Sequence, residues 1–200
     1  MAEPLQVKGF AWLNLLRFVK EKFGAAAVQQ LAGAFPQYKA HFDEHAVLPI
    51  GWLPGAMHLG AVSWVVTQYY GGTTEGAQRF GGELAARNVS STFSSFARLE
   101  DLKVALSSTE RAFGTFYSRG QMKLTLHGDV LDAHLADFPD ANPIFGNVLG
   151  AGMMAFLHAG HVEGALLHVT TGADFIHYQV KLQAVPVSSP TPVPMAPPRG

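Results

Sequence analysis

The sequence contains no cysteine among its 200 residues. Disulfides, thiolate catalysis and cysteine-ligated zinc are therefore excluded, and the absence is typical of a protein that works in the reducing cytoplasm. Charge is also scarce, since only 14% of the residues are charged and the formal net charge is -1. We expect no nucleic-acid partner, because counterion release from phosphates needs a surplus of lysine and arginine.

The motifs of several enzyme classes are missing as well. The sequence has no Gly-x-Ser-x-Gly elbow and no His-Glu-x-x-His helix. Its Gly-Gly-Thr-Thr stretch at 71–74 links two expected helices and lacks the lysine of a phosphate-binding loop. We therefore expect the chain not to be an enzyme, and we expect no cofactor.

Two long stretches, 46–74 and 141–162, contain no charged residue. The second includes Gly146 and Gly150, a spacing that suits close helix packing in membranes. Proline, glycine and polar residues interrupt the first stretch, and the second reaches membrane length only by including asparagine, histidine and glycine. Neither has basic flanks, and the N-terminus lacks the pattern of a signal peptide. We interpret both as buried helical segments and expect no membrane span.

The first 120 residues have the periodicity of helices. Apolar residues recur at helical spacing from Phe10 to Phe23, and Gly24 is well placed to cap that helix. The same reasoning predicts further helices over residues 25–34, 54–70, 74–97 and 101–117, with helix-compatible sequence at 38–45.

Beyond Gly120 the period changes to that of strands. Apolar and polar residues alternate over 122–126 and over 131–135, on either side of Gly128-Asp129, which predicts a hairpin. A helix and a second hairpin are predicted next, over residues 143–159, 165–170 and 175–182. We expect the two hairpins to pair into one four-stranded antiparallel sheet covered by helices on one side, which is an α+β fold.

Residues 1–184 are expected to form this single domain. The remaining segment, 185–200, contains six prolines and has no core-forming pattern. It is predicted to be a solvated, polyproline-like tail. Docking of a proline-recognising partner is an alternative role for it.

Four histidines gather late in the expected domain: His158, His161, His168 and His177. A two-residue turn at Gly172-Ala173 would place His168 opposite His177 on the polar face of the second hairpin. The apolar face of that hairpin would then carry Leu167, Val169, Ile176, Tyr178 and Val180. A catalytic zinc needs three protein ligands, and these imidazoles divide between a helix end and a sheet face. We expect no metal site, and a metal-dependent enzyme is the weakest alternative.

Short motifs resemble a paralogous family of myxobacterial proteins. They are a glycine near the first helix, a Trp-x-Pro motif and a glycine before the first strand, here Gly9, Trp52-Leu53-Pro54 and Gly120. The resemblance covers roughly residues 7–183. The wider superfamily that the chain resembles includes 4-vinyl-reductase-type sensory domains, haem NO/oxygen-binding domains and TRAPP trafficking subunits. It implies a fold that encloses an apolar pocket between helices and sheet, frequent dimerisation, and binding or scaffolding rather than catalysis.

The chain departs from these relatives at their metal-binding positions. Haem-binding members need an axial histidine on a helix ahead of the sheet, whereas this chain has no histidine between His58 and His127. Their Tyr-x-Ser-x-Arg motif is replaced by the contiguous Tyr117-Ser118-Arg119. The 4-vinyl-reductase-type domains commonly carry cysteine near the last hairpin, where this chain has none. The resemblance therefore implies neither haem ligation in that manner nor a thiolate metal site.

The leading hypothesis is a non-enzymatic, cytoplasmic sensory or adaptor domain that binds an apolar small molecule or a protein partner. Arg119, at a helix-to-strand junction, is expected to cap the helix or to meet an anionic end of the ligand. A different class of function, a structural homodimer without a pocket, is the alternative. Core packing competes with ligand binding for each apolar residue expected to line the pocket, namely Trp52, Trp64, Phe80, Phe96, Phe113, Tyr117, Met153 and Phe156.

Overall fold

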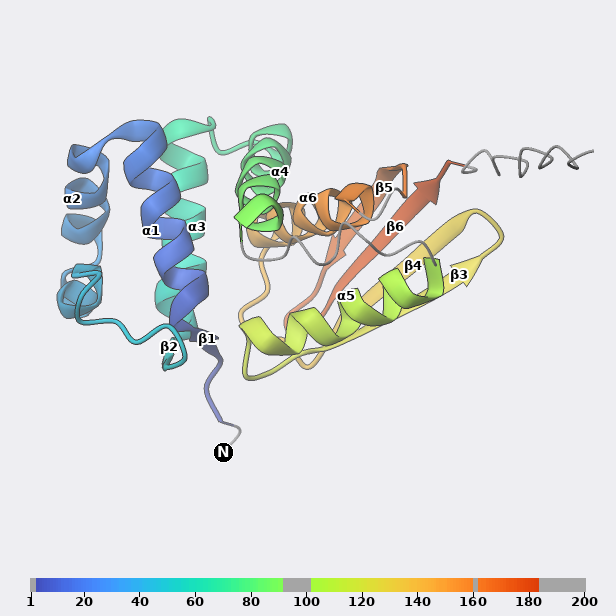
Figure 1. Cartoon of the computed structure of the whole chain (residues 1–200), viewed down its shortest axis with the longest axis horizontal. Coiled ribbons are helices and arrows are strands. Elements are labelled where there is room, and N and C mark those ends of the chain that lie inside the picture. Colours follow the sequence, from blue (N-terminus) through green and yellow to red (C-terminus); the bar gives the residue numbers. More distant parts are fainter. Residues whose placement is uncertain (1–2, 92–101, 160–161, 184–200) are drawn as a thin grey trace, which may run out of the picture.

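The computed structural model describes residues 3–91, 102–159 and 162–183. Helices make up most of the N-terminal half, and two hairpins with one helix between them follow (Figure 1). This order confirms the expected α+β class. In chain order the elements are β1 (Gln6–Lys8), α1 (Gly9–Phe23), α2 (Ala25–Ala34), the 3-10 helix η1 (Pro36–Phe42), β2 (Trp52–Pro54), α3 (Gly55–Tyr69), α4 (Thr74–Ser91), α5 (Leu102–Phe116), β3 (Gln121–His127), β4 (Val130–Ala136), α6 (Pro143–Ala159), β5 (Gly164–Thr171) and β6 (Ile176–Leu182).

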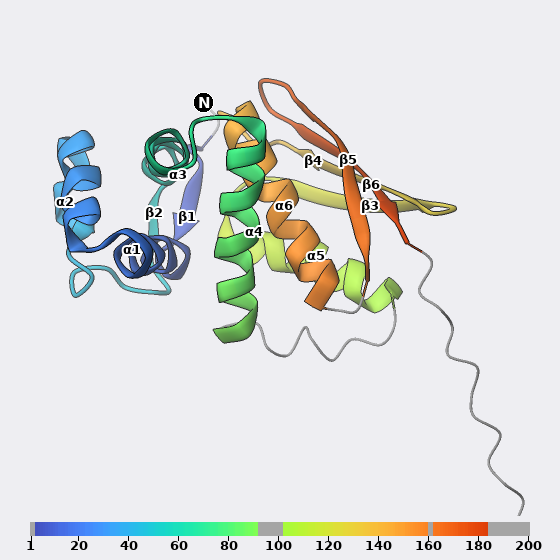
Figure 2. The ribbon, with the colours of Figure 1, turned by 90° about the horizontal axis from the view of Figure 1, so that it is seen from above.

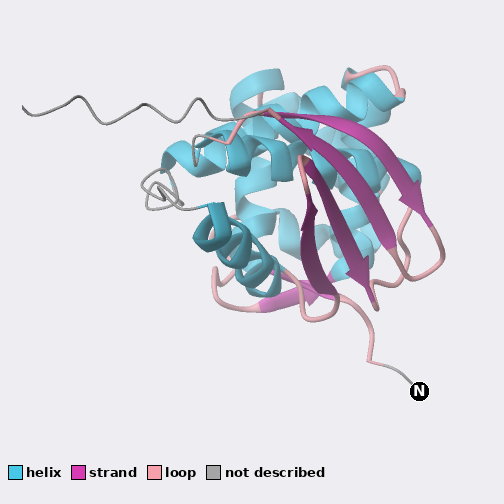
Figure 3. Ribbon diagram, turned by 90° about the vertical axis from the view of Figure 1, so that its right-hand side faces the viewer, coloured by secondary structure: helices cyan, strands magenta, loops and turns pink. Residues whose placement is uncertain are grey.

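The two hairpins pair into one antiparallel sheet of order β3-β4-β6-β5, as predicted. In Figure 3 the viewer looks at one face of this sheet, and the helices lie behind the opposite face. Seen from above, α6 lies against the sheet, α4 packs on α6, and α1 to α3 form a bundle beyond α4 (Figure 2). The face toward α6 carries side chains with no exposed surface, such as Leu131, Leu135 and Tyr178. Strand alternation therefore predicted the core face of β4 and β6 correctly, whereas Leu126 at the end of β3, expected on the same face, is 41% exposed.

Glycines allow the close contacts of α6 with its neighbours. A Cβ atom on Gly150 would lie 2.9 Å from the Tyr178 ring, and one on Gly81 of α4 would lie 2.1 Å from the Val148 carbonyl oxygen. The absence of side chains at Gly146 and Gly150 thus allows α6 to pack closely on the four-stranded sheet. In the described part of the chain, no helix is long and apolar enough to cross a membrane.

The second hairpin differs from the prediction in register. Thr170 pairs with His177, and His168 pairs with Gln179, because the loop spans residues 172–175 and is longer than the predicted two-residue turn. A bulge between Leu166 and His168 interrupts the ladder. It turns Leu167 outward, where this side chain is 57% exposed, so the prediction of a core position for Leu167 is wrong.

Two other features of the N-terminal half differ from expectation. The short sheet of β1 and β2, which pairs Val7 with Leu53, was not predicted, because three-residue strands carry almost no periodic signal. Residues 38–45 were expected to be helix-compatible, but the region forms η1, in which Tyr38 has non-helical dihedrals. The predicted limits of α1 and α2 are confirmed to within one residue, with Gly24 at φ 87° between them. The helix predicted over residues 74–97 corresponds to α4, and its predicted last part, 92–97, lies outside the described residues, as does the predicted tail at 185–200.

Candidate functional site

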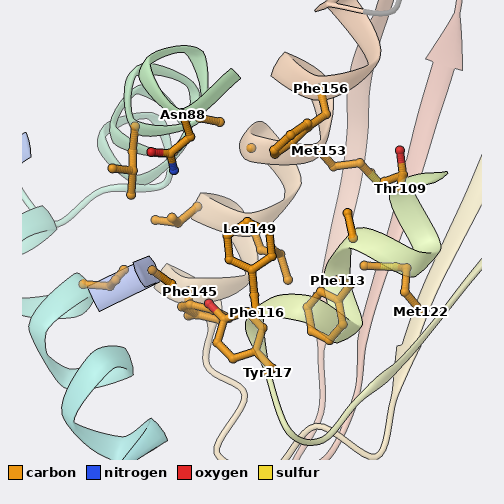
Figure 4. A pocket seen from close by; sticks show the side chains of 18 of the residues that line it. Asn88, Thr109, Phe113, Phe116, Tyr117, Met122, Phe145, Leu149, Met153 and Phe156 are labelled. Atoms are coloured by element: carbon orange, nitrogen blue, oxygen red, sulfur yellow. The ribbon is translucent and has the colours of Figure 1, made fainter. Parts of the chain in front are cut away.

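A cavity of about 130 Å³ lies among α4, α5 and α6, with smaller contributions from α1, α3 and β3. Its walls are almost wholly apolar (Figure 4). Each of the three main helices lines it with one stripe at helical spacing. The stripes are Gly81, Leu84, Ala85 and Asn88 on α4; Thr109, Ala112, Phe113 and Phe116 on α5; and Phe145, Val148, Leu149, Gly152, Met153 and Phe156 on α6.

Small residues on facing helices explain why this space is not filled. Gly81 and Ala85 of α4 lie toward Gly152 of α6, where an added Cβ would be 3.7 Å from the Ala85 methyl group. Ala112 is the small residue that lines the cavity from α5. The large side chains of Phe113, Phe116 and Tyr117 line the cavity from α5 and from the residue that follows it (Figure 4). The cavity therefore exists because small residues from separate segments meet.

Four polar side chains are part of the wall: His58, Asn88, Thr109 and Tyr117. His58 on α3 is only 5% exposed, and burial lowers its pKa to about 4, so its imidazole is neutral at neutral pH. Its Nδ1 atom has no hydrogen-bond partner among the described residues. Burial likewise raises the pKa of Tyr117, which stays a phenol. The wall thus offers hydrogen-bonding groups without charge.

Four of the predicted site residues meet at this cavity: Phe113, Tyr117, Met153 and Phe156. Phe96 lies outside the described residues. The sequence approach missed His58, Asn88 and Leu149. Leu149 shares the helical spacing of Met153 and Phe156 and was identifiable from it, whereas an isolated histidine or asparagine on a helix carries no such signal.

The remaining predicted residues lie elsewhere, and for them the expected placement is wrong. Trp52 on β2 is 40% exposed, with the Lys8 ammonium 3.8 Å from its ring centre. Trp64 is partly buried, packs against the core and contacts Tyr69 of the same helix, α3, edge-on. Phe80 is fully buried between aromatic side chains of α1 and the end of α3. These aromatic residues fill the core or cover the surface, as the core-packing alternative proposed.

Arg119 also points away from the cavity. Its Nη1 donates to the Glu3 carbonyl oxygen at 2.9 Å, and its Nη2 pairs with the Asp137 carboxylate. This residue therefore ties the N-terminal segment to the end of the first hairpin. It neither caps α5 nor reaches an anionic ligand in the cavity.

The wall of the cavity does not fit a haem. No lysine or arginine is among its described residues, so two propionates would lack cationic partners. The helix ahead of the sheet, α5, contains no histidine. Among the described residues of the wall, His58 supplies the imidazole, and within that part of the chain its Nδ1 has no partner of the kind that a metal-ligating histidine almost always has.

The late histidines that the structure describes, His158, His168 and His177, are not part of the cavity wall. His177 contacts the Asp132 carboxylate at 3.0 Å on the sheet face away from α6, and Gln179 donates to the same carboxylate at 3.2 Å. The hydrogen bond from Gln179 is the largest cause that lowers the pKa of the Asp132 carboxyl, and the contact with His177 is the next. His158 pairs with Glu163 at 2.8 Å at the end of α6, and His161 is outside the described residues. Within the described ranges, no group of three or more histidine or acidic residues is arranged to hold a metal ion.

Solved structures share this fold. The Fe(II) unliganded H-NOX protein from K. algicida aligns with a TM-score of 0.59 and 10% identity, over 88% of this chain and 96% of that chain. An oxygen-binding H-NOX domain related to soluble guanylate cyclases aligns with a TM-score of 0.60 and 9% identity, over 88% and 94%. No protein-family model and no curated protein matches the sequence. At this level of identity the likeness concerns the backbone alone, and the chain has the fold seen in H-NOX domains.

Proposed function

We propose that the chain is a non-enzymatic, cytoplasmic sensory or adaptor domain that holds an apolar small molecule in the cavity among α4, α5 and α6. The observation that carries this proposal is the cavity itself, with a volume of about 130 Å³ and nearly uncharged, apolar walls. An engineered apolar cavity of about 150 Å³ stays dry and takes up benzene or xenon. The ligand is therefore of the size of one aromatic ring.

Two further arguments support a binding role. Ligand pockets occur preferentially where a protein encloses apolar space and adds a few polar groups, and this wall has four polar side chains. The sequence also resembles 4-vinyl-reductase-type sensory domains and TRAPP subunits, which implies binding or scaffolding. The structural neighbours include an H-NOX domain described as oxygen binding. Because the wall does not fit a haem, we propose that this chain uses the same fold for an organic ligand.

The proposal predicts that benzene stabilises the protein. A ligand that binds only the folded state at 100 times its dissociation constant adds about 2.7 kcal/mol, so the melting temperature rises with benzene concentration. The variant Ala112→Leu fills the cavity from α5 and should abolish this rise. Ser107→Leu adds the same side chain at an exposed position of the same helix and serves as the control. Thermal unfolding measured with and without benzene decides between these outcomes, and an equal rise in Ala112→Leu would contradict the proposal.

The homodimer alternative stays a prediction. It makes no use of the cavity, so the two hypotheses have different tests. Sedimentation of the purified chain over a range of concentrations would show a dimer if helices of two copies pack together, and a monomer at every concentration would exclude it.

A further inference from the structure

His58 is a polar ring set into an apolar wall. It lies on α3 among aromatic side chains, with ring centres 5.9 Å from Tyr117, 6.4 Å from Phe145 and 6.5 Å from Trp12. Hydrogen-bonding groups that are buried in proteins almost always have a partner, because leaving water without one costs stability. In the described part of the chain the Nδ1 atom of His58 has none. The ring also lines the cavity, so a molecule there can reach it.

The chemistry of this ring limits what the molecule can be. Burial keeps the imidazole neutral, and a neutral imidazole has one nitrogen that accepts and one that donates a hydrogen bond. Its neighbours in the wall are aromatic and aliphatic, and no described residue of the wall carries a charge. A charged ligand would therefore lose its hydration without an opposite charge to compensate it.

We propose that the ligand is an uncharged, ring-sized molecule with one hydroxyl group, and that His58 is the residue that binds this hydroxyl. The inference rests on the proposed function, since it assigns the ligand class of the same cavity. The apolar ring of the ligand occupies the space left by Ala85, Ala112 and Gly152. Its hydroxyl group donates to the unprotonated nitrogen of the imidazole ring that lines the cavity.

The test compares phenol with benzene, which have the same ring and differ by one hydroxyl group. Dissociation constants are measured by calorimetry for the wild type and for His58→Leu. We expect the wild type to bind phenol about tenfold more tightly than benzene, a ratio that corresponds to one hydrogen bond. In His58→Leu this preference should vanish while benzene still binds.

A matched control removes another buried polar group that lacks a partner. The hydroxyl group of Tyr178 on β6 has no hydrogen-bond partner in the described ranges, and Tyr178 is not part of the cavity wall. Tyr178→Phe should therefore leave the preference for phenol unchanged. Circular dichroism of each variant shows whether it is folded.

The wild type provides a second measurement that needs no substitution. In protein labelled with 15N-histidine, the imidazole signals of His58 are the ones missing from His58→Leu, and they should not change between pH 5.5 and 7.5 because burial lowers the pKa of His58 to about 4. Phenol should shift these signals far more than benzene does.

The outcomes separate the two proposals. If neither compound binds the wild type, the proposed function fails. If both bind with equal affinity, or if His58→Leu keeps the preference for phenol, the cavity binds ligands but the role of His58 is overturned.

Discussion

His58 shows how one side chain can be costly to stability and useful for binding. Its neutral imidazole lies in a wall of aromatic rings, where desolvation disfavours the charged form. The large aromatic neighbours have ordinary packing roles. Tyr117 stacks on Phe113 at 5.1 Å, and Phe138 stacks on Phe145 at 5.6 Å. The polar ring is therefore the residue in this region that packing alone does not explain.

The low pKa of His58 predicts a loss of stability in mild acid. The unfolded chain protonates this histidine near pH 6.5, whereas the folded protein does so only near pH 4. Between these values the unfolded state binds more protons, so the free energy of unfolding falls as the pH is lowered. From pH 7.5 to 5 this group accounts for a loss of about 2 kcal/mol. Denaturant unfolding at both pH values should show a correspondingly smaller loss for His58→Leu.

The exposed histidine His158 provides the control for this prediction. Its side chain is 69% exposed, so His158→Gln should keep most of the wild-type dependence on pH. If the free energy of unfolding depended on pH equally in the wild type and in His58→Leu, His58 would not be buried in its neutral form.

At the scale of elements, the contact of α4 with α6 determines the geometry of the cavity. The two helices approach so closely at Gly81 that the Val148 carbonyl oxygen occupies the space a side chain would need. One turn further along, Ala85 and Gly152 are both small, and a Cβ atom on Gly152 would lie at an ordinary van der Waals distance of 3.7 Å from the Ala85 methyl group. The same pair of helices is therefore in very close contact at one point and less tightly packed at the next.

Adjacent glycines on α4 test this arrangement. Gly81→Ala places a Cβ atom 2.1 Å from the Val148 carbonyl oxygen and should destabilise the protein by about 1–3 kcal/mol, as overpacking does. Gly82→Ala meets no atom within 4 Å and should stabilise it by about 0.5–1 kcal/mol, because alanine favours helix. Chemical denaturation measures both changes. Equal effects of the two substitutions would argue against the close approach.

At the scale of the whole molecule, one buried apolar cluster extends from the N-terminal bundle through α4 and α6 into the sheet. The bundle contributes Trp12 and Leu16, and the sheet contributes Leu131 and Val180. The bridge between Val7 and Tyr117 adds a backbone link between β1 and the end of α5. Because the cluster is continuous, we expect the bundle and the sheet to unfold together.

A substitution in the sheet can be detected in the bundle. All three tryptophans lie within the first 64 residues, so their fluorescence reports on the bundle. Leu131→Ala removes a fully buried side chain of β4 and should cost about 2–5 kcal/mol. Tryptophan fluorescence and circular dichroism should then shift to the same lower midpoint. The control is Leu126→Ala on β3, which is 41% exposed and should change the midpoint little. A fluorescence midpoint that Leu131→Ala leaves unchanged would show independent units.

The limits of prediction follow from particular residues. Alternation around Gly128 was sufficient to predict the first hairpin, because a strand with one buried face has a simple period. The bulge at Leu166 to His168 has no such signal, and it reversed the predicted orientation of Leu167. Aromatic content predicted Phe113 and Phe156 at the cavity and also Phe80, which packs in the core. Residue type alone does not distinguish a side chain that lines a space from one that fills it.

The sequence by itself determined the order and type of the principal elements, the α+β class and the absence of thiol chemistry, because these depend on local periodicity and on residue types. Only the tertiary structure decided where the cavity lies and which polar groups face it. Ala85, Ala112 and Gly152 leave space because three helices bring them together. The Nδ1 atom of His58 has no partner among the described residues because aromatic side chains from distant parts of the sequence surround the ring. Such properties depend on contacts between remote segments, which the spacing of residues along the chain does not encode.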